Sequence, residues 1–211
     1  MLAAYQLYMR LKLRGDPAFT IQSVNFKVRQ AWVEKVMADT GKDVLAVQTL
    51  RNSTMAATLM ASTAVFLIIG ALTLSAQGDK LNNIWHALNI FGDTRRELWM
   101  LKVLLIVVDF LFAFFSFSMS VRLYNHIGYM IHSPILPAHV AMYLNRAGNF
   151  YSYGMRAYYF SVPLIFWFFG PHLMIASTLA LICFLYNMDK TPDFLAEDFR
   201  AAVKPASVEK Q

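Results

Sequence analysis

The chain has 211 residues, of which 57% are hydrophobic and only 15% are charged. About a quarter of the residues in a soluble domain are charged, and here the apolar residues fall in long uncharged runs. This composition excludes a disordered chain and indicates a protein whose solvent is lipid. The single cysteine, Cys183, excludes a disulfide framework and a cysteine-rich metal site.

Residues 1–53 predict a short N-terminal helix followed by a cytoplasmic amphipathic helix. The first 14 residues are too few to cross about 30 Å of hydrocarbon, and their basic residues follow the apolar part, unlike in a secretory signal. They predict the end of an uncleaved helix or an interfacial helix. From Thr20 to Lys42, apolar residues recur at three- and four-residue spacing. This pattern indicates a helix that lies on an anionic inner leaflet or against a partner.

Two membrane spans follow from the distribution of charge. No charged residue lies between Arg51 and Asp79, so residues 54–76 predict a spanning helix. A second span is predicted at about 99–121, with Lys102 near one end, from which it can snorkel to the headgroups. Asp109 lies well inside the second span.

A third apolar stretch predicts either a hairpin or one long kinked helix. Residues 157–188 carry no charge, and 32 residues make roughly 48 Å of helix, which is too long for one upright span. Gly170-Pro171 lies near the middle, and proline disfavours helix at the residue before it. The preferred interpretation is a hairpin with spans at about 149–169 and 172–188. A single tilted, kinked helix is the alternative.

The basic residues predict the orientation of these spans. Residues 1–53 contain eight lysines and arginines, against three in residues 77–98. Because cytoplasmic flanks carry the excess of basic residues, the N-terminal segment is expected on the cytoplasmic side of the cell inner membrane. The expected fold is an all-α integral membrane protein, a bundle of about four transmembrane helices over residues 54–188 plus the short N-terminal helix. Residues 189–211 predict a polar, solvated C-terminal tail.

Three segments together resemble a known membrane family. They are VLAVQTLRNSTMAATLMAST at 44–63, AFFSFSMSVRLYNHIGYMI at 113–131 and MRAYYFSVPLIFWFFGP at 155–171. In this order they are similar to the bacterial and plant family catalogued as domain of unknown function 599, over roughly residues 15–190. The resemblance implies a multi-span membrane protein and no assigned activity. It also implies a full first hydrophobic helix, of which residues 1–14 match the last turns, and an uncharged residue in place of Asp109.

A polar cluster is predicted near the cytoplasmic boundary. Two sets of polar residues each share a helix face, one before the first span and one after the second: Gln48, Arg51 and Asn52; Arg122, Asn125 and His126. In an antiparallel helix pair the two sets lie at the same depth. The cluster is expected to hold the helices together, or alternatively to bind an anion or a lipid headgroup.

Asp109 is the single acid within the predicted spans. A carboxylate in hydrocarbon costs at least a few kcal/mol and therefore faces a partner or a wet cavity. The preferred interpretation is a neutral acid that hydrogen-bonds a neighbouring helix. A proton relay is the alternative.

The remaining residue patterns point away from catalysis. The histidine spacings match no zinc signature, and the chain shows no phosphate-binding loop or nucleophile elbow. We therefore expect no metal and no cofactor, and the sequence does not support an enzymatic activity. Besides the bilayer, a membrane-protein partner or a second copy is expected, and the net charge of +6 needs no nucleic acid to explain it. The sequence favours an accessory subunit or scaffold; the alternative is a small transporter or channel that uses Asp109, Arg122 and His126.

Overall fold

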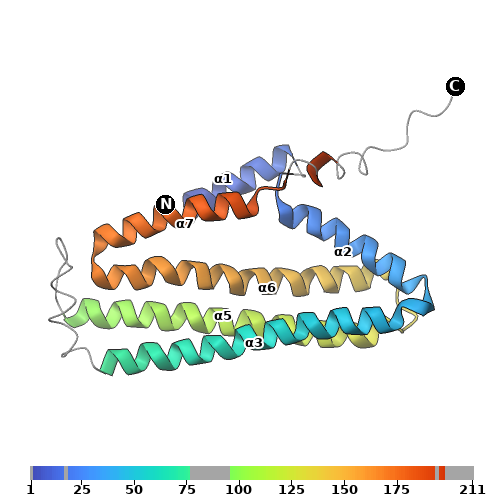
Figure 1. The fold of residues 1–211 in the computed structure, drawn as a ribbon, viewed down its shortest axis with the longest axis horizontal. Coiled ribbons are helices and arrows are strands. Elements are labelled where there is room, and N and C mark those ends of the chain that lie inside the picture. Colours follow the sequence, from blue (N-terminus) through green and yellow to red (C-terminus); the bar gives the residue numbers. More distant parts are fainter. Residues whose placement is uncertain (1, 17–18, 77–95, 193–194, 198–211) are drawn as a thin grey trace.

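The computed structural model describes residues 2–16, 19–76, 96–192 and 195–197, and its regular elements are helices (Figure 1). In chain order these are α1 (Leu2–Gly15), α2 (Ile21–Met37), η1 (Thr40–Lys42), α3 (Asp43–Ala76), α5 (Arg96–Met130), α6 (Pro137–Phe166), η2 (Trp167–Phe169) and α7 (Pro171–Asp189). One isolated antiparallel bridge joins Thr20 to Lys190. The expected all-α membrane bundle is confirmed.

Three helices in the described residues are long and apolar enough to cross a membrane, namely α3, α5 and α7. Helices α3 and α5, with 34 and 35 residues, extend beyond the spans predicted within them. Helix α6 has 30 residues, but polar residues interrupt its first half, among them His139, Asn145, Arg146 and Asn149, and it is not one of the three. A fourth span at 149–169 therefore stays a prediction.

The apolar stretch after residue 157 folds back as a hairpin. Helix α6 ends at Phe166, and one turn of 3-10 helix leads to Gly170, whose φ is 135°. Only glycine adopts such a φ without strain, and Pro171 then starts α7 at a position where its missing N–H costs nothing. As a result, α6 and α7 lie side by side (Figure 1). The turn expected at Gly170-Pro171 is therefore present in the structure, while the spans predicted on its two sides, at 149–169 and 172–188, stay a prediction.

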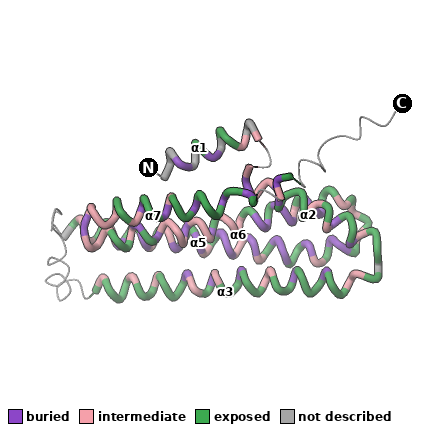
Figure 2. The backbone as a smooth tube through the Cα atoms, turned by 45° about the horizontal axis from the view of Figure 1, so that its top comes forward, coloured by how far each residue is buried: buried purple, intermediate pink, exposed green. Residues whose placement is uncertain are grey.

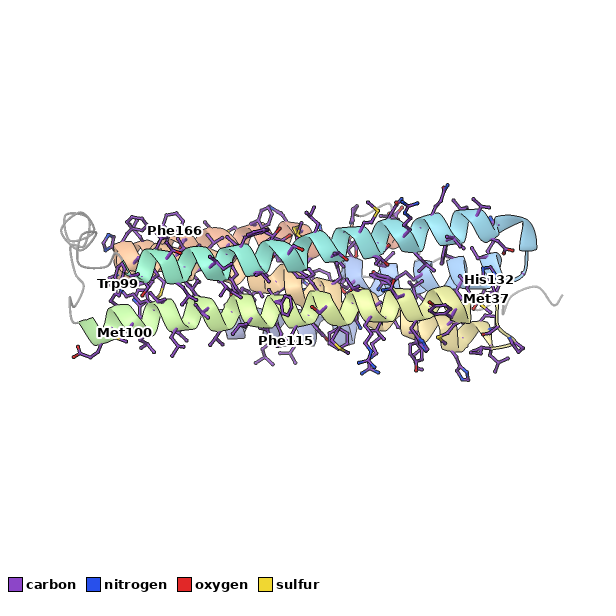
Figure 3. All side chains as sticks on the ribbon, turned by 90° about the horizontal axis from the view of Figure 1, so that it is seen from below. Met37, Trp99, Met100, Phe115, His132 and Phe166 are labelled. Carbon is purple, nitrogen blue, oxygen red and sulfur yellow. The ribbon has the colours of Figure 1, made fainter. Side chains whose placement is uncertain are left out.

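The long helices form a row, with α5 between α3 and α6. Three small residues of α3 are buried, namely Ala57, Ala61 and Ala64. Ala61 and Ala64 pack with Phe117 and Ala157 in the core where α3, α5 and α6 meet. Most outward positions of α3 are exposed (Figure 2). Apolar side chains such as Met100 and Phe115 point away from the bundle, as expected for helices in lipid (Figure 3).

The two N-terminal helices pack on the rest of the chain. Helix α2 lies against α6 and buries Val24, Val33 and Val36. Its apolar face, predicted to meet a leaflet or a partner, is thus largely covered by the protein itself, although Val28 is exposed. Helix α1 packs on α7 through Tyr5 and other apolar residues.

Candidate functional site

The predicted polar cluster is not assembled as a buried contact between α3 and α5. All six side chains are exposed: Gln48, Arg51, Asn52, Arg122, Asn125 and His126. At this depth the core is apolar and includes Leu50 of α3 and Ile127 of α5. Arg51 and Asn52 follow Leu50 directly, so their side chains leave the helix in other directions. Ligand binding by either set stays a prediction.

Asp109 is half-buried on α5, and its Oδ2 atom is buried with no hydrogen-bond partner in the described part of the chain. The next residue, Phe110, meets Tyr158 of α6 edge-on, with ring centroids 6.1 Å apart. Lys102 lies two turns away, about 10 Å along the helix axis. Its ammonium donates to the carbonyl of Trp167 at 2.9 Å. The helix partner expected for Asp109 is therefore not seen among the described residues.

A polar contact that the sequence analysis missed joins α2 to α6. The Nε of Arg29 donates to Oδ1 of Asn145 at 2.7 Å, and Nδ2 of Asn145 donates to the carbonyl of Phe26 at 3.4 Å. Gly148 lies against the guanidinium, where a side chain would collide with it. Burial lowers the pKa of Arg29 from its usual value. The glycine three residues after Asn145 is the sequence signal for this close approach.

A second missed contact joins α1, α6 and α7. The hydroxyl of Tyr5 donates to Oδ2 of Asp189 at 2.9 Å, and Nη2 of Arg156 lies 3.1 Å from Oδ1. Asp189, expected in the solvated tail, is instead the last residue of α7 and is buried. Its two partners compensate the burial of its charge. Burial, together with the hydrogen bond to Asp189, raises the pKa of Tyr5.

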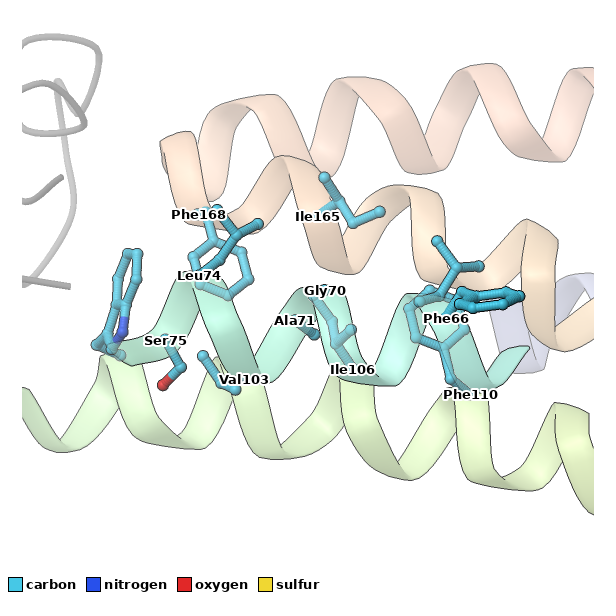
Figure 4. A pocket seen from close by; sticks show the side chains of 12 residues that line it. Phe66, Gly70, Ala71, Leu74, Ser75, Val103, Ile106, Phe110, Ile165 and Phe168 are labelled. Atoms are coloured by element: carbon cyan, nitrogen blue, oxygen red, sulfur yellow. The ribbon is translucent and has the colours of Figure 1, made fainter. Parts of the chain in front are cut away.

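An apolar cavity of about 240 Å³ lies between α3, α5 and the turn from α6 to α7 (Figure 4). Its lining includes Phe66, Gly70, Ile106, Phe110 and Phe168. Apart from Ser75 and Trp99 the lining side chains are apolar, so the cavity suits a hydrocarbon group and not a polar solute. Within the described residues, no three His, Cys, Asp or Glu side chains come together as a metal site.

Comparison with known proteins identifies the family. A family model described as "Protein of unknown function, DUF599" matches residues 1–193. The chain belongs to this family. No curated protein and no solved structure matches it.

The DUF599 match confirms the resemblance expected from the three motifs. It extends to residue 1, beyond the segment 15–190 that the motifs covered, and so includes α1 and its contact with Asp189. Because the DUF599 description assigns no activity, the function of this DUF599 protein has to be argued from its helix surfaces and buried polar groups.

Proposed function

We propose that this DUF599 protein is an accessory subunit or scaffold of a membrane complex, without catalysis of its own. The observation that carries the proposal is an outward stripe along α3, called here the α3 stripe. Its positions alternate in spacing between four and three residues, and all are exposed: Met55, Leu59, Ser62, Phe66, Ile69 and Thr73.

The α3 stripe has the features of a helix-packing surface. A spacing of four and three residues keeps side chains on one seam for several turns, which is what a second helix needs. Phe66 and Leu59 are 73% and 62% exposed and can act as knobs. Ser62 is small and sits between them, so another helix can approach closely there. The inward face of α3 is already used, because Ala57 and Ala64 are fully buried.

Native mass spectrometry of the chain, extracted gently from its own membrane, tests this proposal. We expect a stoichiometric larger membrane protein in the same particle. Ser62→Leu blocks close approach at the α3 stripe and should dissociate the partner. The matched control, Ala176→Leu, adds bulk on an exposed position of α7 and should leave the complex intact.

Site-specific photo-crosslinking separates a protein partner from lipid. A photoreactive residue at Leu59 should give one discrete protein adduct. The same residue at Leu179 of α7, which is 49% exposed, should give lipid adducts. Lipid adducts at both positions, or a lone chain or homo-oligomer that holds a small ligand, would contradict the scaffold proposal.

A second candidate, a small transporter or channel, is favoured by Asp109. Its buried, unpaired Oδ2 atom in the described structure is a feature that proton-coupled carriers use, and Arg122 and His126 lie further along the same helix. Asp109→Asn keeps the shape of the side chain but removes its proton exchange. Proton-linked uptake or efflux lost in this variant would support a transporter, whereas a complex and growth unaffected by it would support the scaffold.

We also propose that the protein lies in the cell inner membrane with its basic N-terminal segment in the cytoplasm. The eight basic residues before the first predicted span support this orientation. Reporter fusions check it: a fusion before α1 should be active with a cytoplasmic reporter and silent with a periplasmic one. The opposite pattern would reverse the orientation.

A further inference from the structure

Arg29 is a half-buried cation that no carboxylate neutralises within the described residues. Its Nε is held by Asn145 at 2.7 Å. A Cβ atom at Gly148 would come within 2.9 Å of Nη1, which shows that the guanidinium lies directly on the backbone of α6. The terminal nitrogens Nη1 and Nη2 donate to no described acceptor. A guanidinium stays protonated even where burial disfavours its charge, so the positive charge is permanent.

Asn145 orients Arg29 without neutralising it. Asn145 is only 3% exposed, and its amide is held in turn by the carbonyl of Phe26 at 3.4 Å. The Nε–H group of Arg29 therefore donates to a neutral amide, while the N–H groups of Nη1 and Nη2 remain available for a ligand. Arg29 itself is half-buried, so part of its side chain is accessible from outside.

The surroundings of Arg29 favour a negatively charged ligand. Tyr124 of α5 is near enough for the charge of Arg29 to act on its hydroxyl, but that hydroxyl is neutral at pH 7. Glu34 on α2 is exposed and accepts a hydrogen bond from Gln30. Residues 122–148 contain Arg122 and Arg146 and no acid. None of the described contacts of the guanidinium is with a carboxylate, so its charge has no counterion among them.

The depth of Arg29 suits a lipid phosphate. Asn145 and Gly148 precede the span predicted at 149–169, and Tyr124 follows the span predicted at 99–121. The guanidinium thus lies at the predicted cytoplasmic boundary, where the phosphates of anionic lipids are found. A planar guanidinium with free terminal N–H groups matches the oxygens of a phosphate better than any other side chain does.

We propose that Arg29, oriented by Asn145 over Gly148, binds a phosphate group between α2 and α6, either in the headgroup of an anionic phospholipid or as free phosphate. The site is separate from the α3 stripe, which lies on the other side of α5. It ties α2 to the inner leaflet at a defined point.

A lipid titration of the full chain in detergent, followed by native mass spectrometry, tests the site. We expect Arg29→Gln to weaken phosphatidylglycerol binding by about tenfold or more, as for loss of a charge-assisted hydrogen bond. Lys35→Gln is the matched control, because Lys35 is an exposed cation on the same helix, α2, and it should change binding by less than about twofold. Equal effects of the two variants would overturn the proposal.

A second variant separates phosphate binding from a purely structural role. Asn145→Asp pairs Arg29 with a carboxylate. The resulting ion pair strengthens the contact between α2 and α6 but neutralises the positive charge that a phosphate would bind. We expect an unchanged or higher thermal midpoint together with about tenfold weaker lipid binding. Unchanged lipid binding in this variant would show that Arg29 only holds the helices together.

The same preparation titrated with inorganic phosphate identifies the source of the ligand. Phosphate that competes with phosphatidylglycerol only in protein carrying Arg29 would confirm one shared site. Binding of phosphate alone, lost in Arg29→Gln, would assign free phosphate as the ligand. Binding of neither in an Arg29-dependent way would refute the site.

Discussion

Adding a single methyl group at Gly154 should destabilise the protein. Gly154 is buried in α6, and a Cβ atom there would lie 2.6 to 2.8 Å from three ring carbons of Phe117. The ring cannot move aside easily, because Phe117 is fully buried and lies against Tyr151 and Tyr158, at centroid distances of 5.5 and 5.4 Å. Overpacking of this kind costs about 1–3 kcal/mol. We expect Gly154→Ala to lower the free energy of unfolding by about 2 kcal/mol.

Gly128→Ala is the matched control. Gly128 is also inside a long helix, on α5, but a Cβ atom there would meet nothing within 4 Å. Alanine is favoured over glycine in a helix by about 0.5–1 kcal/mol, so this variant should be slightly more stable. The same methyl group therefore has opposite effects at the two glycines.

Thermal unfolding of the purified protein in detergent measures both effects. With about 2–4 °C per kcal/mol for a chain of this size, Gly154→Ala should lower the midpoint by about 4–8 °C and Gly128→Ala should raise it slightly. Combining Gly154→Ala with Phe117→Leu should cost less than the two single changes added together, because the smaller side chain leaves room for the methyl group. Shifts of the same sign at both glycines, or strictly additive changes, would refute the packing argument.

Three further predictions concern the buried polar contacts. Ser120 is fully buried and donates to a backbone carbonyl of α6 at 2.9 Å, so Ser120→Ala should lower the free energy of unfolding by about 0.6–1.7 kcal/mol. In a chemical-denaturation series the exposed control Ser62→Ala should hardly change this free energy, and equal losses in the two variants would count against the role of Ser120. The pKa of Tyr5 is raised in the folded state, so the stabilising effect of its hydroxyl is complete below the ordinary tyrosine pKa of about 10 and is lost as the pH rises above that value. In an alkaline unfolding series the stability of Tyr5→Phe should therefore fall less than that of the parent protein. Parallel curves for the two proteins would contradict this. Asp189→Asn removes the negative charge that holds Tyr5 of α1 and Arg156 of α6. Tryptic cleavage in α1 should therefore become several-fold faster than in Glu97→Gln, the control in which an exposed carboxylate is removed. Equal cleavage rates in the two variants would disprove the anchoring role.

The sequence by itself determined the helical membrane class and favoured a turn at Gly170-Pro171. Long uncharged runs have one stable backbone in lipid, because every N–H and C=O must be satisfied within the segment. Gly170-Pro171 is a local signal, since glycine supplies the positive φ and proline starts the next helix. Such features depend only on neighbouring residues, and three motifs in order were also enough to identify the DUF599 family.

The candidate site was less predictable, because spacing shows which residues share a face but not where that face points. Gln48, Arg51 and Asn52 were expected to meet the polar set of α5, yet at this depth residues such as Leu50 and Ile127 form the packed core. Burying apolar side chains between the helices leaves the charged groups at the surface, where they stay hydrated. The rotation of each helix about its axis was decided by this packing.

Only the tertiary structure decided which polar residues meet. The Arg29–Asn145 contact joins positions 116 residues apart, and the Tyr5–Asp189 contact joins positions 184 residues apart. No local pattern pairs such residues, because each looks like an ordinary polar residue of its own helix. They meet because α2 packs on α6 and α1 packs on α7. Composition and local signals thus determined the class, the turn and the family of this protein, while long-range helix packing determined its buried polar contacts.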